Sequence, residues 1–468
     1  MNYSTTLILI PTTLLIVSCS SFKQSGSDYA QPKFQPAANY KSTTSSQLDV
    51  SSQWWKTFKD SKLNSLQSEL IAQNLNLAAA YTRRQQALAR LGIANSNRFP
   101  QLNATGGGSR ERASQNGQAS NLFDAYFNQY NVGANLSYEL DLWGRVRDLV
   151  RAGKADAEAA NFAIADVRVT LQTQLARQYF ALRFLDSEMV TLESAVNTRQ
   201  ENVKITTERL EQGLTSELDS ARATAELANA QAELLSLKGP RAQLENSIAV
   251  LLGRQASTFR ISPRDYTGNL PHIPAGLPAA LLYRRPDLAV AERKVAVATA
   301  QIGVAEKDRY PKISLTGSAG FNSVSSSNLL QWSSSFFAVG PSVSVPIFQG
   351  RRIKSNILHT KAQRAEALIN YQQTAIAAIA DVESAIANLS ALREETTARK
   401  ASVDAASRTY ELSILRYKEG VTSYLDVADA ERERLTAERA AVRTRGQQFA
   451  ATIQLIQSLG GGFETNSK

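Results

Sequence analysis

Residues 209–219 read Arg-Leu-Glu-Gln-Gly-Leu-Thr-Ser-Glu-Leu-Asp, and residues 416–426 read Arg-Tyr-Lys-Glu-Gly-Val-Thr-Ser-Tyr-Leu-Asp. The two stretches lie 207 residues apart (416 − 209). Each follows a long sequence without proline. A glycine after such a sequence commonly ends a helix. The repeat therefore predicts two helical hairpins that turn at Gly213 and Gly420.

Further matches extend the repeat toward the N-terminus of each copy. Arg98-Phe-Pro-Gln-Leu102 recurs as Arg309-Tyr-Pro-Lys-Ile313, at an offset of 211 residues (309 − 98). Each copy is predicted to contain a helix, two strands and a long helical hairpin. The expected repeats span residues 59–268 and 269–458, and a tail follows over 459–468.

Alternating polar and apolar residues predict the strands. The first alternating run spans Tyr126–Leu142, and its counterpart spans Phe337–Ile347. Shorter runs begin after Pro100 and after Pro311, where a strand can start without losing a ladder bond. Polar loops are expected at Arg110–Asp124 and Ser323–Ser334.

Strands with one apolar face and one polar face suit a membrane barrel whose lumen is filled with water. A soluble sheet with one buried face is the alternative. Four strands cannot close a barrel, and membrane strands cannot leave edges open. Three chains would supply 12 strands (4 × 3), which can close. The predicted fold is thus an α+β membrane protein: a trimeric 12-stranded β-barrel, with four strands per chain, continuous with a long α-helical coiled-coil barrel.

The helical hairpins are too long to cross a bilayer. The segment from Gly144 to Gly213 would extend roughly 100 Å at ~1.5 Å per residue, so it should project into an aqueous compartment. A second helix is expected from about Ser216 to Leu252. Leucines and other apolar residues at spacings of three, four or seven predict a coiled-coil seam along the first helix. They are Leu171, Leu175, Leu182, Leu185, Met189, Leu192, Val196, Val203 and Leu210.

The N-terminus has the pattern of an export signal. Leu7–Val17 is mostly apolar but too short to span a membrane as a helix. Leu15-Ile-Val-Ser-Cys19 is similar to a bacterial lipobox, and Cys19 is the chain's one cysteine. We predict a signal peptide over 1–18, acylation of Cys19 (palmitate included) and a lipid-anchored strap over 19–58. An ordinary signal peptide with a chance cysteine is the alternative, and no Lys or Arg precedes Leu7.

Composition disfavours several other functions. The net charge is +10, but the Lys and Arg residues are scattered among acidic ones, which is typical of solvated helix faces and not of a nucleic-acid site. The two histidines, His272 and His359, have no neighbouring ligand in sequence, so neither a metal nor another cofactor is expected. No phosphate loop or nucleophile elbow is present, so we expect no enzyme activity.

Several motifs, in order along the chain, give it a family resemblance. They are Trp54–Phe58, Ser137–Arg145, Arg284–Asp287, Pro346–Arg351, Arg416–Asp429 and Leu459–Gly462. With these motifs the chain resembles the TolC/NodT family of outer-membrane factors, in its lipoprotein branch. Within Arg284–Asp287, Pro286 suits a first helical turn and Asp287 suits its positive end, which indicates a structural role.

The resemblance implies a location and partners. We expect a homotrimer anchored in the cell outer membrane, with its helical barrel in the periplasm. The expected partners are a periplasmic adaptor (a membrane fusion protein) and an inner-membrane pump, most often proton-driven. The implied function is the channel of a tripartite efflux pump that passively conducts drugs or other small toxic compounds. The exit duct of a protein-secretion system and a non-conducting envelope tether are alternatives.

The repeated turns supply the candidate site residues. Adaptor docking is assigned to Arg209, Gly213, Thr215, Ser216, Arg416, Gly420, Thr422 and Ser423. By resemblance, Asp426 and Asp429 are expected to line a pore gate as acidic rings. The resemblance also implies a gate latch that includes Asp219 and Tyr417. Thr422 stands where TolC itself has an arginine in this latch. The alternative for both aspartates is that they suit the positive end of a helix.

Overall fold

The computed structural model describes residues 29–37, 39–41, 51–112, 114, 126–271, 273 and 284–463. Cys19, the predicted signal peptide and His272 lie outside these residues. The chain forms two compact units. Among the described residues, the sheet unit contains 97–149 and 298–362, and the helical unit contains 31–96, 150–297 and 363–463, within the described ranges.

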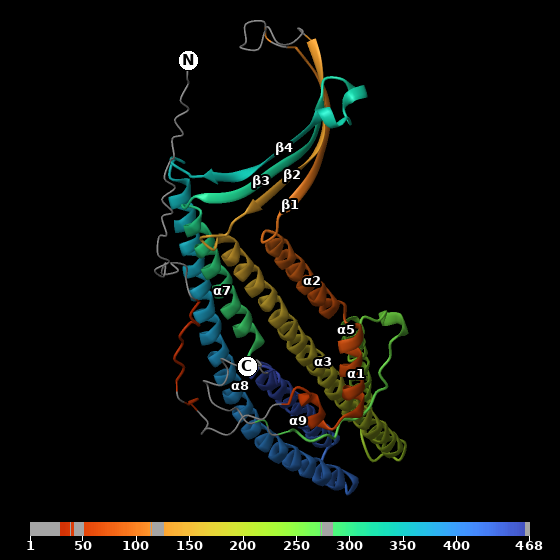
Figure 1. Ribbon diagram of the computed structural model, residues 1–468. Helices are drawn as coiled ribbons and strands as arrows, with labels where there is room; N and C mark the ends of the chain where they lie inside the picture. The colour runs from red at the N-terminus through yellow and green to blue at the C-terminus, as the bar shows by residue number, and fades with distance from the viewer. Residues whose placement is uncertain are drawn as a thin grey trace, which may run out of the picture. The chain divides into compact units, whose positions relative to one another are not determined.

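The sheet unit is an antiparallel meander of four strands (Figure 1). In order across the sheet they are β1 (Gln101–Arg112), β2 (Tyr126–Glu139), β3 (Lys312–Ser323) and β4 (Ser335–Ser344). Each repeat thus contributes one hairpin, and β2 pairs with β3 across the repeats, with Gly133 opposite Gly320. The four predicted strands are confirmed.

Three strand boundaries differ from the prediction. β1 continues to Arg112, three residues into the predicted loop. β2 ends at Glu139, before the predicted Leu142. One further hydrogen bond, from Leu140 N to Ile313 O at 2.8 Å, lies just beyond the end of the strand. β4 ends at Ser344, and Pro346, which has no N–H to donate, follows closely. The predicted loop after β3 contains two 3-10 turns, η4 (Ser326–Asn328) and η5 (Trp332–Ser334).

The sheet has two open edges within the chain. β1 and β4 each pair on one side among the described strands. The apolar side chains of β4 are exposed, including Phe337 at 84% and Val339 at 69%. Unpaired edges and exposed apolar side chains are the features expected of a sheet that needs further strands and lipid around it.

A buried ion pair joins the two repeats beside the sheet. Asp148 Oδ2 lies 2.5 Å from Lys307 Nζ, and both side chains are almost fully buried. Gly303 provides room, because a Cβ there would lie 2.1 Å from Asp148 Oδ2. Trp143 Nε1 also donates to Pro311 O at 2.7 Å. The beginning of one repeat's long helix is therefore bound to the end of the other repeat's short helix.

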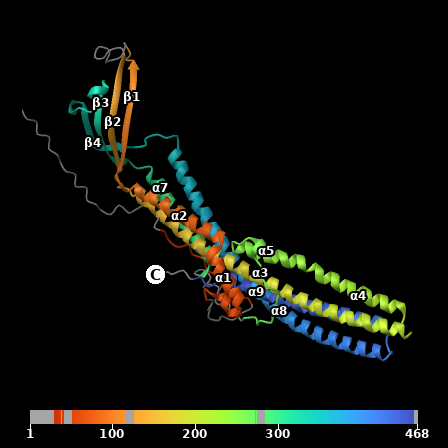
Figure 2. The same ribbon diagram turned by 90° about the vertical axis from the view of Figure 1, so that its right-hand side faces the viewer.

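Helices make up most of the rest of the described chain. They are α1 (Ser61–Gln73), α2 (Leu75–Ser96), α3 (Arg145–Glu211), α4 (Glu217–Ser236), α5 (Lys238–Leu251), α7 (Pro286–Lys307), α8 (Arg352–Lys418) and α9 (Tyr424–Ser458), with 3-10 turns η1 (Trp54–Phe58) and η2 (Ala256–Thr258). α3 and α8 both have 67 residues, as the repeat predicts. The hairpin of α3 and α4 lies beside the hairpin of α8 and α9 (Figure 2).

One predicted helix is wrong. The single helix expected from Ser216 to Leu252 is divided into α4 and α5 at Leu237. Pro240 is the third residue of α5, and it lacks the N–H that would continue the ladder to Ser236. The equivalent α9 has no proline and runs unbroken for 35 residues.

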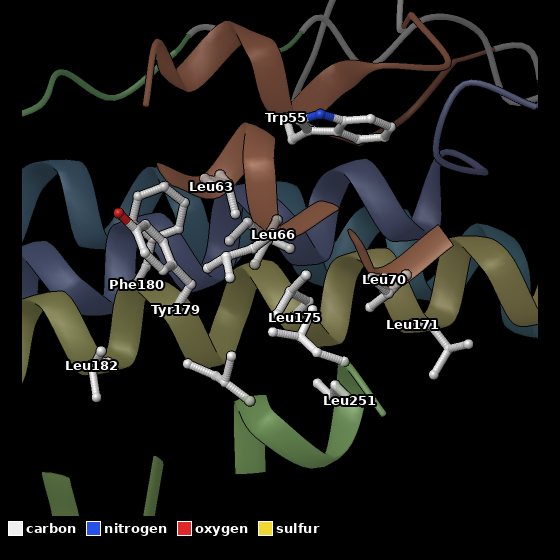
Figure 3. Close-up of a cluster of buried hydrophobic side chains, with 14 of the residues drawn as sticks. Trp55, Leu63, Leu66, Leu70, Leu171, Leu175, Tyr179, Phe180, Leu182 and Leu251 are labelled. Atoms are coloured by element: carbon white, nitrogen blue, oxygen red, sulfur yellow. The ribbon is translucent and has the colours of Figure 1, made fainter. Parts of the chain in front are cut away.

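The core of the helical unit gathers around α3 (Figure 3). Leu63, Leu66 and Leu70 of α1 belong to this core together with Leu171, Leu175 and Leu182 of α3. The Trp54–Phe58 motif adds three aromatic side chains to this core, and Asp60 caps α1. Farther along the predicted seam Leu192 is buried, whereas Leu185, Met189, Val196, Val203 and Leu210 are half-buried in a single chain.

Two of the resemblance motifs pack against each other. Arg285 binds Asp287 through two hydrogen bonds, of 2.7 and 3.1 Å, and donates to Ser458 O at 3.1 Å. Gly460 adopts φ +89°, and a Cβ there would lie 1.9 Å from Arg284 O. α7 begins at Pro286 with Asp287 in its first turn, as predicted. The structural interpretation of this motif is confirmed.

Candidate functional site

The two hairpin turns have the same backbone geometry. Gly213 and Gly420 adopt φ +70° and +76°, a conformation that favours glycine. Leu214 N donates to Arg209 O at 2.9 Å, and Val421 N donates to Arg416 O at 2.9 Å. These bonds across the last turn satisfy carbonyls that the ending helices leave free. The sequence repeat is therefore a repeat of turn geometry.

The residues after each glycine begin the returning helix. Thr215 Oγ1 donates to Asp219 Oδ2 at 2.7 Å, and Thr422 Oγ1 donates to Asp426 Oδ2 in the same way. Ser423 completes a capping box with Asp426. The hydroxyls of Thr422 and Ser423 hold the pKa of Asp426 below its usual value. Within one chain, Asp219 and Asp426 thus each accept a hydrogen bond from the equivalent threonine, and Asp426 alone of the two also takes part in a capping box.

The tips are exposed on both turns. Gly213, Ser216, Gly420 and Ser423 are exposed, and Thr215 and Thr422 are half-buried. An apolar side chain follows each glycine, and Leu214 and Val421 are 60% and 61% exposed. Both tips therefore combine an apolar side chain with accessible hydroxyls and backbone.

The predicted gate aspartates lie on the exposed face of α9. Asp426 and Asp429 are both exposed, one helical turn apart. Asp429 Oδ1 pairs with Arg432 Nη1 at 2.9 Å, and Arg432 Nη2 reaches Glu226 Oε1 of α4 at 2.6 Å. The structure thus brings the two aspartates together and links one of them to the neighbouring hairpin.

A buried ionic cluster, defined here as Arg199, Asn202, Glu226 and Glu431, lies next to this pair. Glu431 is 1% exposed and accepts hydrogen bonds from Arg199 Nε at 3.2 Å and Asn202 Nδ2 at 3.1 Å. Arg199 Nη1 lies 3.4 Å from Glu226 Oε2. Burial raises the pKa of Glu431. The cluster joins α3, α4 and α9, so it ties one hairpin to the other.

Sequence reasoning missed this cluster, although a signal was present. Glu431 falls on the apolar stripe of α9, seven residues after Tyr424 and four before Leu435. A carboxylate at such a position needs a buried partner.

The predicted latch pair does not meet within one chain. Asp219 accepts from Thr215, and Tyr417 Oη is buried without a hydrogen-bond partner among the described residues. Tyr417 packs instead against the Tyr424 ring, at 5.6 Å between centroids, and beneath the Arg209 guanidinium. Within one chain Thr215 therefore occupies the Asp219 carboxylate, and the latch that the resemblance implies stays a prediction.

An open four-stranded sheet and two long helical hairpins with repeated turns are the features expected of one chain of an outer-membrane channel. The sequence matches the family described as Outer membrane efflux protein over residues 66–254 and 277–461. The chain belongs to this family.

Individual relatives agree with the family. TtgC of Pseudomonas putida, a probable efflux pump outer membrane protein, is 29% identical over 98% of this chain and 95% of its own length. SrpC of Pseudomonas putida, a solvent efflux pump outer membrane protein, is 31% identical over 87% of each chain. The solved structure of the outer-membrane channel OprN matches with a TM-score of 0.87 at 30% identity, covering 94% of this chain and 99% of that one.

These matches confirm the predicted family and class of function. The chain has the fold of the trimeric outer-membrane channels, with four barrel strands in each chain. It is the outer-membrane channel of a tripartite efflux pump, and its helical barrel extends into the periplasm. Among the residues that the structure describes, no group of three or more His, Cys, Asp or Glu side chains could hold a metal ion.

Proposed function

We propose that three copies of this chain form a passive duct without enzyme activity, which works with a periplasmic adaptor and a proton-driven inner-membrane pump. The observation that carries this proposal is the sheet with two unpaired edges, which one chain cannot close. Relatives named for solvent and antibiotic efflux support small organic compounds as the cargo.

A single preparation tests the assembly. Detergent-purified protein should have the mass of three chains and should conduct ions in a planar bilayer. Co-expressed adaptor and pump should be retained with it on affinity purification. A monomer that conducts on its own would contradict the trimer.

We further propose that the chain is anchored by acyl groups on Cys19. The motif before Cys19 supports this, as does the absence of any other cysteine in the sequence. Two acyl chains on one residue give stable anchoring where one does not. The barrel would remain a separate attachment to the membrane.

The tips are proposed to dock the adaptor. Three chains would present six similar turns, which suits a six-fold ring of adaptors. The residues predicted from the sequence to form the contact surface are Arg209, Gly213, Thr215, Ser216, Arg416, Gly420, Thr422 and Ser423. Among them, Arg209 also contacts the second hairpin of its own chain. Their exposure and their repeated geometry support this assignment.

Asp426 and Asp429 are proposed to form the gate. Both carboxylates are exposed in one chain and share one helix face. In a trimer they would place six carboxylates around the axis, and such rings favour cations over anions. The capping role of Asp426 is compatible with this, because its carboxylate remains at the surface.

A further inference from the structure

The two turns place equivalent arginines in different surroundings. Arg209 and Arg416 each precede their glycine by four residues, and each offers its backbone carbonyl to the same hydrogen bond of the turn. Backbone geometry therefore does not distinguish them. Their side chains do.

The Arg209 side chain reaches from α3 to the second hairpin. Its Cζ lies 5.0 Å from the centre of the Tyr417 ring, and its Nη1 donates to Lys418 O at 3.2 Å. Its Nη2 is also the atom nearest to where a Cβ on Gly420 would lie, at 3.9 Å. One guanidinium thus contacts a ring, a helix-terminal carbonyl and the turn of the opposite hairpin.

Tyr417 is suited to this contact through its ring and not its hydroxyl. The side chain is 3% exposed, and the Tyr424 ring supports it from another side. Its Oη has no partner in the described chain. A guanidinium over an aromatic face is attracted by the ring's negative face, and shielding from water strengthens that attraction. The planar group can donate to a carbonyl at the same time.

Arg416 has no comparable contact. Its side chain is exposed, and it pairs with no carboxylate at salt-bridge distance among the residues described. Its attraction lowers the pKa of Asp426, but less than the hydrogen bonds from Thr422 and Ser423 do. Within one chain, the first hairpin's arginine therefore contacts the second hairpin, whereas the second hairpin's arginine is exposed.

We propose that Arg209 is a clasp between the two hairpins of one chain, which holds the gate end closed through Tyr417 and the Lys418 carbonyl. Of the two equivalent arginines, only Arg416 then meets the adaptor. This inference rests on the proposed gate and docking functions. It makes Arg209 a positioning residue, since it acts on the aperture through α8 and not by touching the cargo. It also predicts that the six tips are not equivalent to an approaching adaptor.

A set of four variants tests the clasp in planar bilayers with purified trimers. Arg209→Ala and Tyr417→Leu should each increase the resting conductance about fivefold, the size expected from losing one cation–π contact whose guanidinium is partly exposed. The double variant should conduct no more than Arg209→Ala, because that substitution already removes the contact with Tyr417 together with the bond to Lys418 O. Tyr417→Phe, which keeps the ring, should conduct like the wild type. Arg408→Ala, an exposed arginine of the same helix α8, is the control.

Capture of the purified adaptor by the same trimers separates the two arginines. Arg416→Ala should lose most of the capture, and Arg209→Ala should keep it. If Arg209→Ala instead loses capture and conducts normally, Arg209 is a docking residue and the clasp is wrong. If the effects of Arg209→Ala and Tyr417→Leu on conductance add, the two residues do not act together and the clasp is also wrong.

The same measurements distinguish a failure of the gate proposal from a failure of the clasp proposal. If the clasp variants raise conductance while changes at Asp426 and Asp429 leave ion selectivity unaltered, the aspartates are not the gate and the clasp stands. If Tyr417→Leu prevents trimer formation, the other two single variants still test the clasp: Arg209→Ala should raise the conductance, and Tyr417→Phe should leave it unchanged.

Discussion

Glu431 of α9 accepts a hydrogen bond from Arg199 of α3 at 3.2 Å, and both side chains are almost completely buried. The pair therefore joins the two hairpins of one chain through charged groups that are shielded from water. Breaking a buried pair leaves one uncompensated charge, whereas replacing both partners removes the cost of burying either.

We expect Arg199→Met to destabilise the protein by about 3–5 kcal/mol, because Glu431 would stay buried without its cation. The double variant Arg199→Met with Glu431→Leu should recover most of that loss. Denaturant unfolding of the purified trimer, followed by circular dichroism, measures both. Equal losses in the single and double variants would show that the pair contributes packing and not charge compensation.

The pH dependence of stability should reveal the same carboxyl. Burial raises the pKa of Glu431 in the folded chain, so the folded chain binds this proton more readily than the unfolded chain does. Lowering the pH through the folded pKa therefore adds stability, and the gain is complete below the ordinary glutamate pKa. Glu431→Gln should flatten this part of the profile. An unchanged profile in that variant would assign the dependence to another group.

The hairpin turns should be sensitive to substitution at their glycines. Gly213→Val and Gly420→Val place a branched side chain at φ +70° and +76°, where a left-handed conformation costs roughly 1–2 kcal/mol. Neither position is crowded, so the effect should be local distortion of the tip. Efflux should be abolished while the yield of trimer is retained. Drug resistance measured in cells that depend on this channel tests the prediction.

Gly239→Ala is the matched control, because Gly239 lies in helix α5 with nothing near its would-be Cβ and no left-handed φ. It should leave efflux unchanged. Normal resistance in both valine variants would argue against a docking role for the tips.

The sequence was sufficient for the elements and insufficient for the contacts between them. Alternation and the 207-residue repeat predicted four strands and two hairpins, because these patterns reflect local geometry. The division at Leu237 differs from the prediction because Pro240 has no N–H to continue the helical hydrogen bonds, an effect that the apolar pattern does not reveal. Arg199–Glu431 and Arg209–Tyr417 were missed for a different reason: each joins residues more than 200 positions apart, and pattern alone does not specify which helix faces meet.

The acyl anchor is tested at the mature N-terminus. Mass spectrometry should find Cys19 as the first residue, carrying two or three acyl chains. Cys19→Ser should still be exported and should still form trimers, since the barrel provides its own attachment to the membrane. An unmodified terminus, or cleavage at another position, would contradict the lipobox interpretation.

The gate is tested by ion selectivity. Asp426→Asn with Asp429→Asn removes both carboxylates from each chain and keeps polar side chains of similar size. The amide oxygen introduced in place of Asp426 can still accept the hydrogen bond from Ser423 N in the capping box of α9. Because six carboxylates would be lost from the axis of the trimer, cation selectivity and block by multivalent cations should both decrease. Reversal potentials across a salt gradient in planar bilayers measure the first effect, and conductance with added multivalent cation measures the second. Asp404→Asn, which changes an exposed aspartate of α8, is the control for a general change of surface charge. If the double variant selects ions like the wild type and like this control, the carboxylates of Asp426 and Asp429 serve the start of α9 and its ion pair with Arg432, and the aperture must be lined by other residues.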